Sequence, residues 1–187
     1  MASSLPRYAY RTHQGHMLDL SEPEAISFDL QDIAHHLARI CRFGGAVDGY
    51  YSVASHCVYV ATELEREGYR RSIVQAGLLH DAAEAYIGDM VSGLKRLMPE
   101  YRRLEDRYTA AIEHQFSVTF HGSRIIKTAD LRARLSECRD LFEDYPRELL
   151  LGGEDGLEPY ATRVAPQPPD EAEWAFMHTA RRLGLYP

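Results

Sequence analysis

The stretch SIVQAGLLHDAAEAYIGDM, from Ser72 to Met90, decides how this sequence folds. Apolar and small residues recur in it at intervals of three and four, the pattern of one face of a helix. That face comprises Ile73, Ala76, Gly77, His80, Ala83, Glu84 and Ile87. The pattern predicts a helix that ends at Gly88 and carries an imidazole and a carboxylate one turn apart on the side facing the core.

The dipeptide His80-Asp81 is unusual on such a helix. A buried charge without a partner is costly, so a compensating group is required if this face is buried. A bound metal ion would supply that compensation. The simpler alternative is an exposed histidine–aspartate pair at the solvated edge of the helix, and the dipeptide taken alone favours it.

Helical patterns on both sides of this stretch predict an all-α fold, a single-domain helical bundle over residues 1–187. One helix begins at the N-cap Asp29 and ends at Gly44-Gly45. Further helices are expected over about 52–67, from the N-cap Ser92 to Leu97, from Pro99 to Phe116, after Ser123, and over about 169–183. The motifs lie within residues 28–135; residues 1–27, with a short hairpin, and the loop 145–169 are peripheral.

Composition excludes several classes of function. The net charge of −7 disfavours a surface for nucleic acid polymers, which a basic stripe usually contacts. No run of about 18 apolar residues predicts a membrane-spanning helix, and the N-terminus lacks the apolar core of a secretory signal. The cysteines, Cys41, Cys57 and Cys138, are odd in number and scattered, which is typical of free thiols in a reducing cytoplasm.

Two more polar residues lie on apolar helix faces, His56 and Asp130. Each has an ordinary explanation, since His56 alone is more often a core histidine and Asp130 alone a cap or ion-pair residue. Together with His80 and Asp81 they form a set of two imidazoles and two carboxylates. Such a set suits a divalent metal ion, namely Co²⁺, Mn²⁺, Zn²⁺, Ni²⁺ or Mg²⁺.

The order and spacing of this set resemble the HD-domain phosphohydrolase superfamily. His56 is followed after 23 residues by His80-Asp81, and after a further 48 residues by Asp130, which matches the signature H…HD…D. The blocks IAHHLARICRFGG (33–45), YSVASH (51–56), HDAAEAYIGD (80–89) and KTAD (127–130) resemble bacterial HD-domain 5′-deoxynucleotidases and phage or prophage HD enzymes. The phage enzymes include dATP triphosphohydrolases of the DatZ type.

The resemblance implies a role for each matching residue. His56, His80, Asp81 and Asp130 would hold the metal, and Glu84 would orient or deprotonate the attacking water. A metal-bound water would then attack phosphorus.

The substrate-binding residues implied by the resemblance are fewer and less closely matched. Arg42 matches an arginine that contacts the phosphate, and Asp89 an aspartate at the sugar and phosphate end. Phe43 stands where the deoxynucleotidases carry a tryptophan, and Lys95 adds positive charge near the phosphate.

The expected function is metal-dependent hydrolysis of a deoxynucleotide in the cytoplasm. The substrate is a small molecule, either a dNMP that loses phosphate or a dNTP that loses triphosphate, and the sequence leaves both open. A non-catalytic HD-fold nucleotide sensor or regulatory subunit is the alternative, although Glu84 argues against it. Helical enzymes of this type and size also imply a homo-oligomer.

Overall fold

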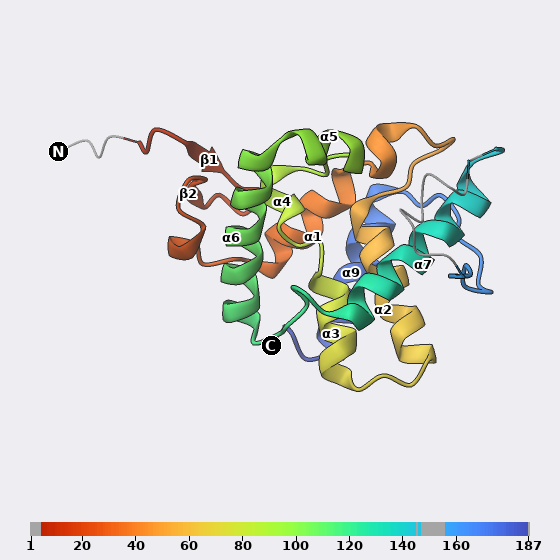
Figure 1. Cartoon of the computed structure of the whole chain (residues 1–187). Helices are drawn as coiled ribbons and strands as arrows, with labels where there is room; N and C mark the ends of the chain where they lie inside the picture. The colour runs from red at the N-terminus through yellow and green to blue at the C-terminus, as the bar shows by residue number, and fades with distance from the viewer. Residues whose placement is uncertain (1–4, 145, 147–155, 187) are drawn as a thin grey trace.

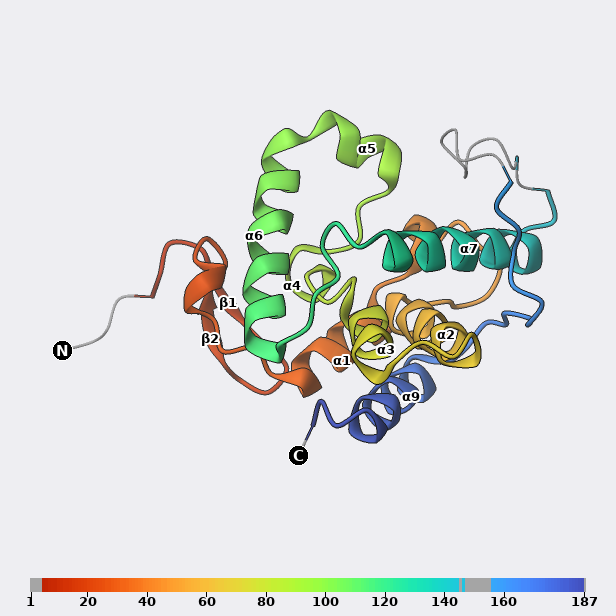
Figure 2. The same cartoon turned by 60° about the horizontal axis from the view of Figure 1, so that its bottom comes forward.

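The helix that carries His56 lies at the centre of the molecule. A computed structural model, which describes residues 5–144, 146 and 156–186, shows this helix as α2 (Val53–Arg66) (Figure 1). The helices that pack against it are α1 (Leu30–Arg39), α3 (Arg71–Leu79), α7 (Arg124–Leu141) and α9 (Pro169–Arg182). Helices α7 and α9 lie on opposite sides of the α2–α3 pair (Figure 2). The expected all-α, single-domain fold is confirmed.

Local sequence explains where α2 begins and why it is central. The Ser52 side chain caps the helix, because its Oγ accepts a hydrogen bond from the Ser55 amide at 3.1 Å. Several of its apolar side chains are completely buried: Val53, Ala54, Cys57, Val60, Ala61 and Leu64. His56 is also completely buried, so the imidazole has to find its partners inside the protein.

Helix α3 approaches α2 closely because of Gly77. A Cβ atom at this position would lie 2.4 Å from Leu64 Cδ1 and 3.4 Å from Val60 Cγ1. Glycine therefore allows the backbone of α3 to pack directly against the Leu64 and Val60 side chains of α2. This close packing brings the end of α3 next to His56.

The predicted continuous helix to Gly88 is wrong, because the helix is interrupted at the histidine–aspartate pair. Helix α3 ends at Leu79, residues 80–83 form a turn, and α4 covers only Glu84–Ile87. In the turn, the Ala82 amide donates to Leu79 O at 2.9 Å and the Glu84 amide to Asp81 O at 3.0 Å. These bonds span three residues rather than four, so the chain tightens where the polar side chains project.

The predicted end of the first helix at Gly44-Gly45 is also wrong. Helix α1 begins after its cap Asp29 as expected but ends at Arg39. The next residues pair with the segment before α2, since the Arg42 amide donates to Tyr51 O and the Val53 amide to Ile40 O, both at 3.0 Å. This pairing leads into a short 3₁₀ helix η2 (Arg42–Gly45), in which Phe43 has the left-handed φ of 55°.

The peripheral elements agree with expectation apart from one cap. Strands β1 (Ala9–Arg11) and β2 (Met17–Asp19) form the expected antiparallel hairpin, with Ala9 opposite Asp19. The hairpin lies beside α6 (Pro99–Phe116), which also contacts the 3₁₀ helix η1 (Pro23–Ala25) (Figure 1). Helix α5 (Ser92–Leu97) has Val91 at its N-cap, so the predicted capping role of Ser92 is wrong.

Of the loop expected over 145–169, residues 145 and 147–155 lie outside the described residues, and 156–168 carry no helix or strand.

Among the described residues, no helix is both long enough and apolar enough to cross a membrane. The main hydrophobic core draws on α1, α2, α3, α6, α7 and α9, and its completely buried members include Ile33, Leu78 and Phe176.

Candidate metal centre

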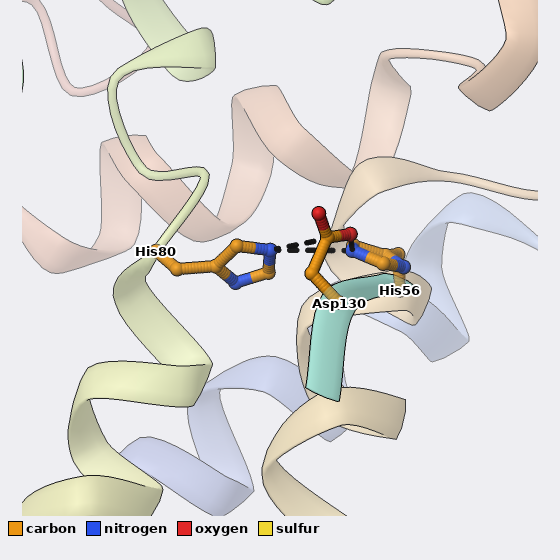
Figure 3. Close-up of side chains that lie close together, drawn as sticks. All are labelled: His56, His80 and Asp130. Carbon is orange, nitrogen blue, oxygen red and sulfur yellow. Dashed lines mark hydrogen bonds and ion pairs between the residues drawn. The ribbon is translucent and has the colours of Figure 1, made fainter. Parts of the chain in front are cut away.

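Three of the side chains predicted as metal ligands, His56, His80 and Asp130, converge between α2, the turn after α3, and α7 (Figure 3). His56 Nε2 lies 3.2 Å from His80 Nε2 and 3.1 Å from Asp130 Oδ1. Asp81 Oδ2 lies 3.2 Å from His80 Nε2 and 3.6 Å from His56 Nε2. The fold thus gathers His56, His80, Asp81 and Asp130 from segments far apart in the sequence. His56 Nε2 lies within 3.6 Å of one donor atom of each of the other three residues.

The protonation of the two imidazoles follows from their other nitrogens. His80 Nδ1 lies 2.8 Å from Gly77 O, a carbonyl that can only accept, so this nitrogen carries hydrogen. His56 Nδ1 lies 2.5 Å from Glu137 Oε1 and donates to that carboxylate. In the neutral rings both Nε2 atoms would carry lone pairs, and these would face each other. Either a proton shared by the two nitrogens or a metal ion bound between them relieves the repulsion of these lone pairs.

The spacing of the donor atoms fits a small divalent ion. Ligands bound at about 2.0–2.1 Å in a tetrahedral arrangement lie about 3.4 Å apart. The distances from His56 Nε2 to the other donors run from 3.1 to 3.6 Å, and His80 Nε2 lies 4.0 Å from Asp130 Oδ1. Asp130 Oδ1 is buried and makes no geometrically acceptable hydrogen bond in the described part of the chain. The buried His/Asp group is therefore compatible with a bound divalent metal ion.

Cys57 lies beside His80 and Asp81 and is the remaining sulfur donor of this cluster. Burial raises the pKa of the Cys57 thiol to about 11, an effect that His80 only partly opposes. A thiol with this pKa stays protonated near neutral pH, whereas metals bind the thiolate. A bound metal ion would itself deprotonate a coordinating thiol, so Cys57 also belongs to the candidate ligands.

The electrostatics of the cluster also favour a cation. Burial lowers the pKa of His80, but the adjacent Asp81 carboxylate outweighs burial and raises that pKa well above its ordinary value. Burial raises the pKa of Asp130, but Arg134 and His56 reverse this and hold it well below its ordinary value. The aspartates thus remain charged and stabilise any positive charge placed between the imidazoles.

Sequence reasoning missed Glu137, which lies next to this centre. Its carboxylate is completely buried and accepts hydrogen bonds from His56 Nδ1, from Tyr51 Oη at 3.1 Å and from Arg42 Nη2 at 3.2 Å. Burial raises the pKa of Glu137, but His56 and Arg42 outweigh it and lower the value to about 2. Its position two turns after Asp130 on the apolar face of one helix was the available signal.

Glu84 begins α4 directly after the turn and is 5% exposed. Its Oε2 is buried without a hydrogen-bond partner among the described residues. Burial, followed by the nearby charges of Asp81 and Asp89, raises the pKa of Glu84 well above its ordinary value. The structure thus holds a buried carboxyl group beside the ligands, and Asp89 lies close enough to influence its pKa.

Arg42 is almost completely buried. Its Nη1 lies 3.5 Å from Asp81 Oδ2, and its Nη2 contacts Glu137. The guanidinium carbon lies 5.5 Å from the centre of the Phe43 ring, which packs edge-on against Phe142 at 5.2 Å. Phe43 therefore packs toward the end of α7.

Lys95 forms an ion pair with Glu105 at 2.6 Å, and its charge is close enough to interact with Glu84 and Asp81.

A cavity of about 1110 Å³ opens beside the centre. Its lining includes His80, Asp130, Glu105, Arg124 and Lys127. A cavity of this size has room for a nucleotide-sized ligand.

Comparison with known proteins identifies relatives of this chain, and the names of these relatives state no activity. The chain is 36% identical over 149 residues to the uncharacterized protein YfdR of Escherichia coli (strain K12), covering 79% of this chain and 80% of YfdR. It is 32% identical over 182 residues to the uncharacterized protein RCAP_rcc00048 of Rhodobacter capsulatus, covering 91% and 92% of the two chains. The chain belongs to the family of YfdR. No family model matches it.

In this YfdR-family chain, the other histidines of the N-terminal half connect the hairpin to α1. His16 Nδ1 lies 3.1 Å from the buried Asp32, which also accepts from the Gln14 amide at 2.7 Å. The His13 ring stacks on that of His35 at 3.5 Å. These contacts give the histidines of the hairpin a structural role outside the metal centre.

Proposed function

We propose that this protein is a metal-dependent phosphohydrolase of the HD-domain type that acts on deoxynucleotides. The observation that carries the proposal is the pair of facing Nε2 atoms of His56 and His80, 3.2 Å apart, with Asp81 and Asp130 beside them. This is the ligand set implied by the resemblance of the H…HD…D signature.

A divalent ion at these ligands would polarise a phosphate oxygen and lower the pKa of a bound water toward neutrality. His56 and His80 would bind it as neutral donors because Glu137 and Gly77 O hold the protons on their Nδ1 atoms. Asp81 and Asp130 would neutralise its charge. One or more coordination positions would remain for solvent and substrate.

Glu84 is the residue that we assign to proton transfer. Its carboxylate is buried next to Asp81 and Asp89, and in its charged form it can accept a proton from a water beside the ligands. A module that only binds nucleotides has no use for a carboxylate held in this position. The carboxylate thus favours an enzyme over the alternative of a non-catalytic nucleotide sensor or regulatory subunit.

Phosphate recognition would draw on the positive charges around the centre. Arg42 lies against Asp81 and provides a fixed guanidinium charge for a phosphate, as the resemblance implies. Lys95 would add a second charge, while Arg124 and Lys127 line the adjoining cavity. Such preorganised charges stabilise the phosphoryl transition state. Asp89 would face the sugar side.

The test is product analysis with purified, metal-stripped protein. Each dNMP and dNTP is incubated with Co²⁺ or Mn²⁺, with and without a chelator, and released phosphate and triphosphate are quantified. Phosphate from dNMPs identifies a 5′-deoxynucleotidase, and triphosphate from dNTPs identifies a triphosphohydrolase. The matched control is Asp81→Asn, which removes a ligand charge and should abolish release.

Two results would contradict the proposal. Release that persists in Asp81→Asn or in the presence of chelator would exclude a role for this centre. Nucleotide binding without any hydrolysis would instead identify the sensor.

A further inference from the structure

The buried carboxylate of Glu137 contacts two different parts of the candidate metal centre at once. Its Oε1 accepts from His56 Nδ1 at 2.5 Å, and its Oε2 accepts from Arg42 Nη2 at 3.2 Å. Arg42 in turn reaches Asp81 Oδ2 through its Nη1 at 3.5 Å. Glu137 thus touches one ligand directly and a second ligand through a single guanidinium.

The position of Glu137 in the fold makes these contacts rigid. It lies on α7, two turns after Asp130, and its side chain is completely buried. Tyr51 Oη, from the segment before α2, donates to the same Oε1 at 3.1 Å. One carboxylate therefore joins α7, α2 and η2, the segment that carries Arg42.

The structure assigns Glu137 as the positioning residue of the metal centre, which fixes the His56 ring with Nε2 toward the ion and holds Arg42 against Asp81. A histidine ligand with its other nitrogen bonded to a carboxylate is oriented and made more basic, and loss of such a partner weakens metal binding. This inference rests on the proposed function only for the presence of a metal.

Glu137→Gln cannot keep both contacts of the carboxylate. A glutamine has one accepting oxygen and one donating NH₂ group. If the oxygen faces His56 Nδ1, the NH₂ group opposes the N–H groups of Arg42. If the side chain is turned over, the NH₂ group opposes the hydrogen on His56 Nδ1. In either orientation one contact is lost.

The experiment is Co²⁺ titration of the metal-free full-length protein, followed by its visible spectrum. Glu137→Gln should raise the Co²⁺ dissociation constant about 10–100-fold. The matched control is Glu63→Gln, which removes a different buried carboxylate, one that lies on α2. Its Oε1 accepts hydrogen bonds from Arg66 Nη1 at 2.6 Å and from Thr162 Oγ1 at 2.7 Å. The control should bind Co²⁺ as the unmodified chain does.

A second readout reports the ring itself. The ¹⁵N chemical shifts of His56 in the Zn²⁺-loaded protein should show hydrogen on Nδ1 in the unmodified chain and a changed Nδ1 signal in Glu137→Gln. If Glu137→Gln does not fold, Glu137→Asp takes its place. Its side chain is one methylene shorter and cannot keep both contacts, so it should also weaken Co²⁺ binding.

Unchanged Co²⁺ affinity in Glu137→Gln, or in Glu137→Asp if that variant is used, would overturn the inference. An equal loss of affinity in Glu63→Gln would also overturn it, since the effect would then be one of general stability. The absence of Co²⁺ binding in the unmodified chain would overturn both the metal centre and the inference. Weakened Co²⁺ binding in a chain that hydrolyses no nucleotide would support the inference and contradict the proposed function alone.

Discussion

The chemistry of the candidate centre depends on two ring nitrogens, Nε2 of His56 and Nε2 of His80. Gly77 O accepts a hydrogen bond from His80 Nδ1, and the Glu137 carboxylate accepts one from His56 Nδ1. In the neutral rings the two Nε2 atoms, 3.2 Å apart, would therefore present lone pairs to each other. A proton or a metal ion between the two nitrogens relieves the repulsion of these lone pairs, and the neighbouring Asp81 and Asp130 carboxylates stabilise either positive charge. The case for a metal therefore rests on the identity and the gathering of the ligands.

Glu84→Gln tests the assignment of proton transfer to this residue. The amide cannot accept a proton, so kcat for nucleotide hydrolysis should fall about 10²–10⁴-fold. Co²⁺ affinity should stay unchanged, because Glu84 is not among the converging donors. Steady-state kinetics and Co²⁺ titration measure the two effects. Asp81→Asn is the contrasting variant, since it should lose both; retained turnover in Glu84→Gln would remove this residue from the mechanism.

At the scale of secondary structure, helix periodicity and capping residues were enough to predict most elements. The caps Asp29 and Ser123 begin helices as expected, and each accepts a hydrogen bond from a backbone amide in the first turn. The break at His80 was not predicted, because the tightened turn places polar groups against partners from α2 and α7. Local sequence carries no information on such tertiary contacts.

The same reasoning explains why the candidate site was predicted in part. His56, His80, Asp81 and Asp130 were found because their order is a signature. Glu137 has no such signature, and a glutamate inside a helix is ordinarily a surface residue. Only its contact with His56 Nδ1, formed between two helices, reveals its importance.

Gly77→Ala should destabilise the α2–α3 pair. The added Cβ would lie 2.4 Å from Leu64 Cδ1 in a completely buried environment, and overpacking of this kind costs about 1–3 kcal/mol. Alanine regains about 1 kcal/mol of helix propensity, so the free energy of unfolding should fall by up to about 2 kcal/mol. Urea denaturation measures it. Gly93→Ala is the control, because its Cβ would meet nothing within 4 Å; an equal loss there would exclude the packing explanation.

Asp140→Asn should loosen the attachment of the segment after residue 156 to α7. Burial raises the pKa of Asp140, but hydrogen bonds from Arg139, the Val164 amide and Arg163 outweigh it and lower the value to about 2. The carboxylate therefore stabilises the fold by about 2 kcal/mol at neutral pH.

This stabilisation has a defined pH dependence. A lowered carboxyl pKa contributes stability that is complete above the unfolded value near pH 4 and is lost as the pH falls toward 2. The difference in unfolding free energy between the unmodified chain and Asp140→Asn should therefore shrink to about half at pH 3. Urea titrations at pH 7 and pH 3 measure it, with the exposed Glu143→Gln as control. A difference independent of pH would contradict the electrostatic origin.

At the scale of the whole molecule, the candidate ligands connect elements that are distant in the chain. His56 lies on α2, His80 on the turn between α3 and α4, and Asp130 on α7 (Figure 3). Asp81 lies on the same turn as His80. Without a metal, the imidazoles and carboxylates attract one another, since Asp81 raises the pKa of His80 and His56 helps to lower the pKa of Asp130. A bound ion would add a cross-link between the same elements of the bundle. The expected homo-oligomer remains a prediction, to be measured by light scattering.

Metal binding should therefore raise the thermal stability of the whole bundle. An ion that binds only the folded chain stabilises it by about 2.7 kcal/mol at a hundredfold excess over its dissociation constant. For a chain of 187 residues, this corresponds to a rise in Tm of about 5–10 °C. Differential scanning calorimetry with Co²⁺ and with chelator measures the shift. Asp81→Asn should unfold at the same temperature in both conditions, because it lacks a ligand. If the metal raises the Tm of this variant as much as that of the unmodified chain, the ion binds elsewhere and the cross-link between α2, α3 and α7 does not exist.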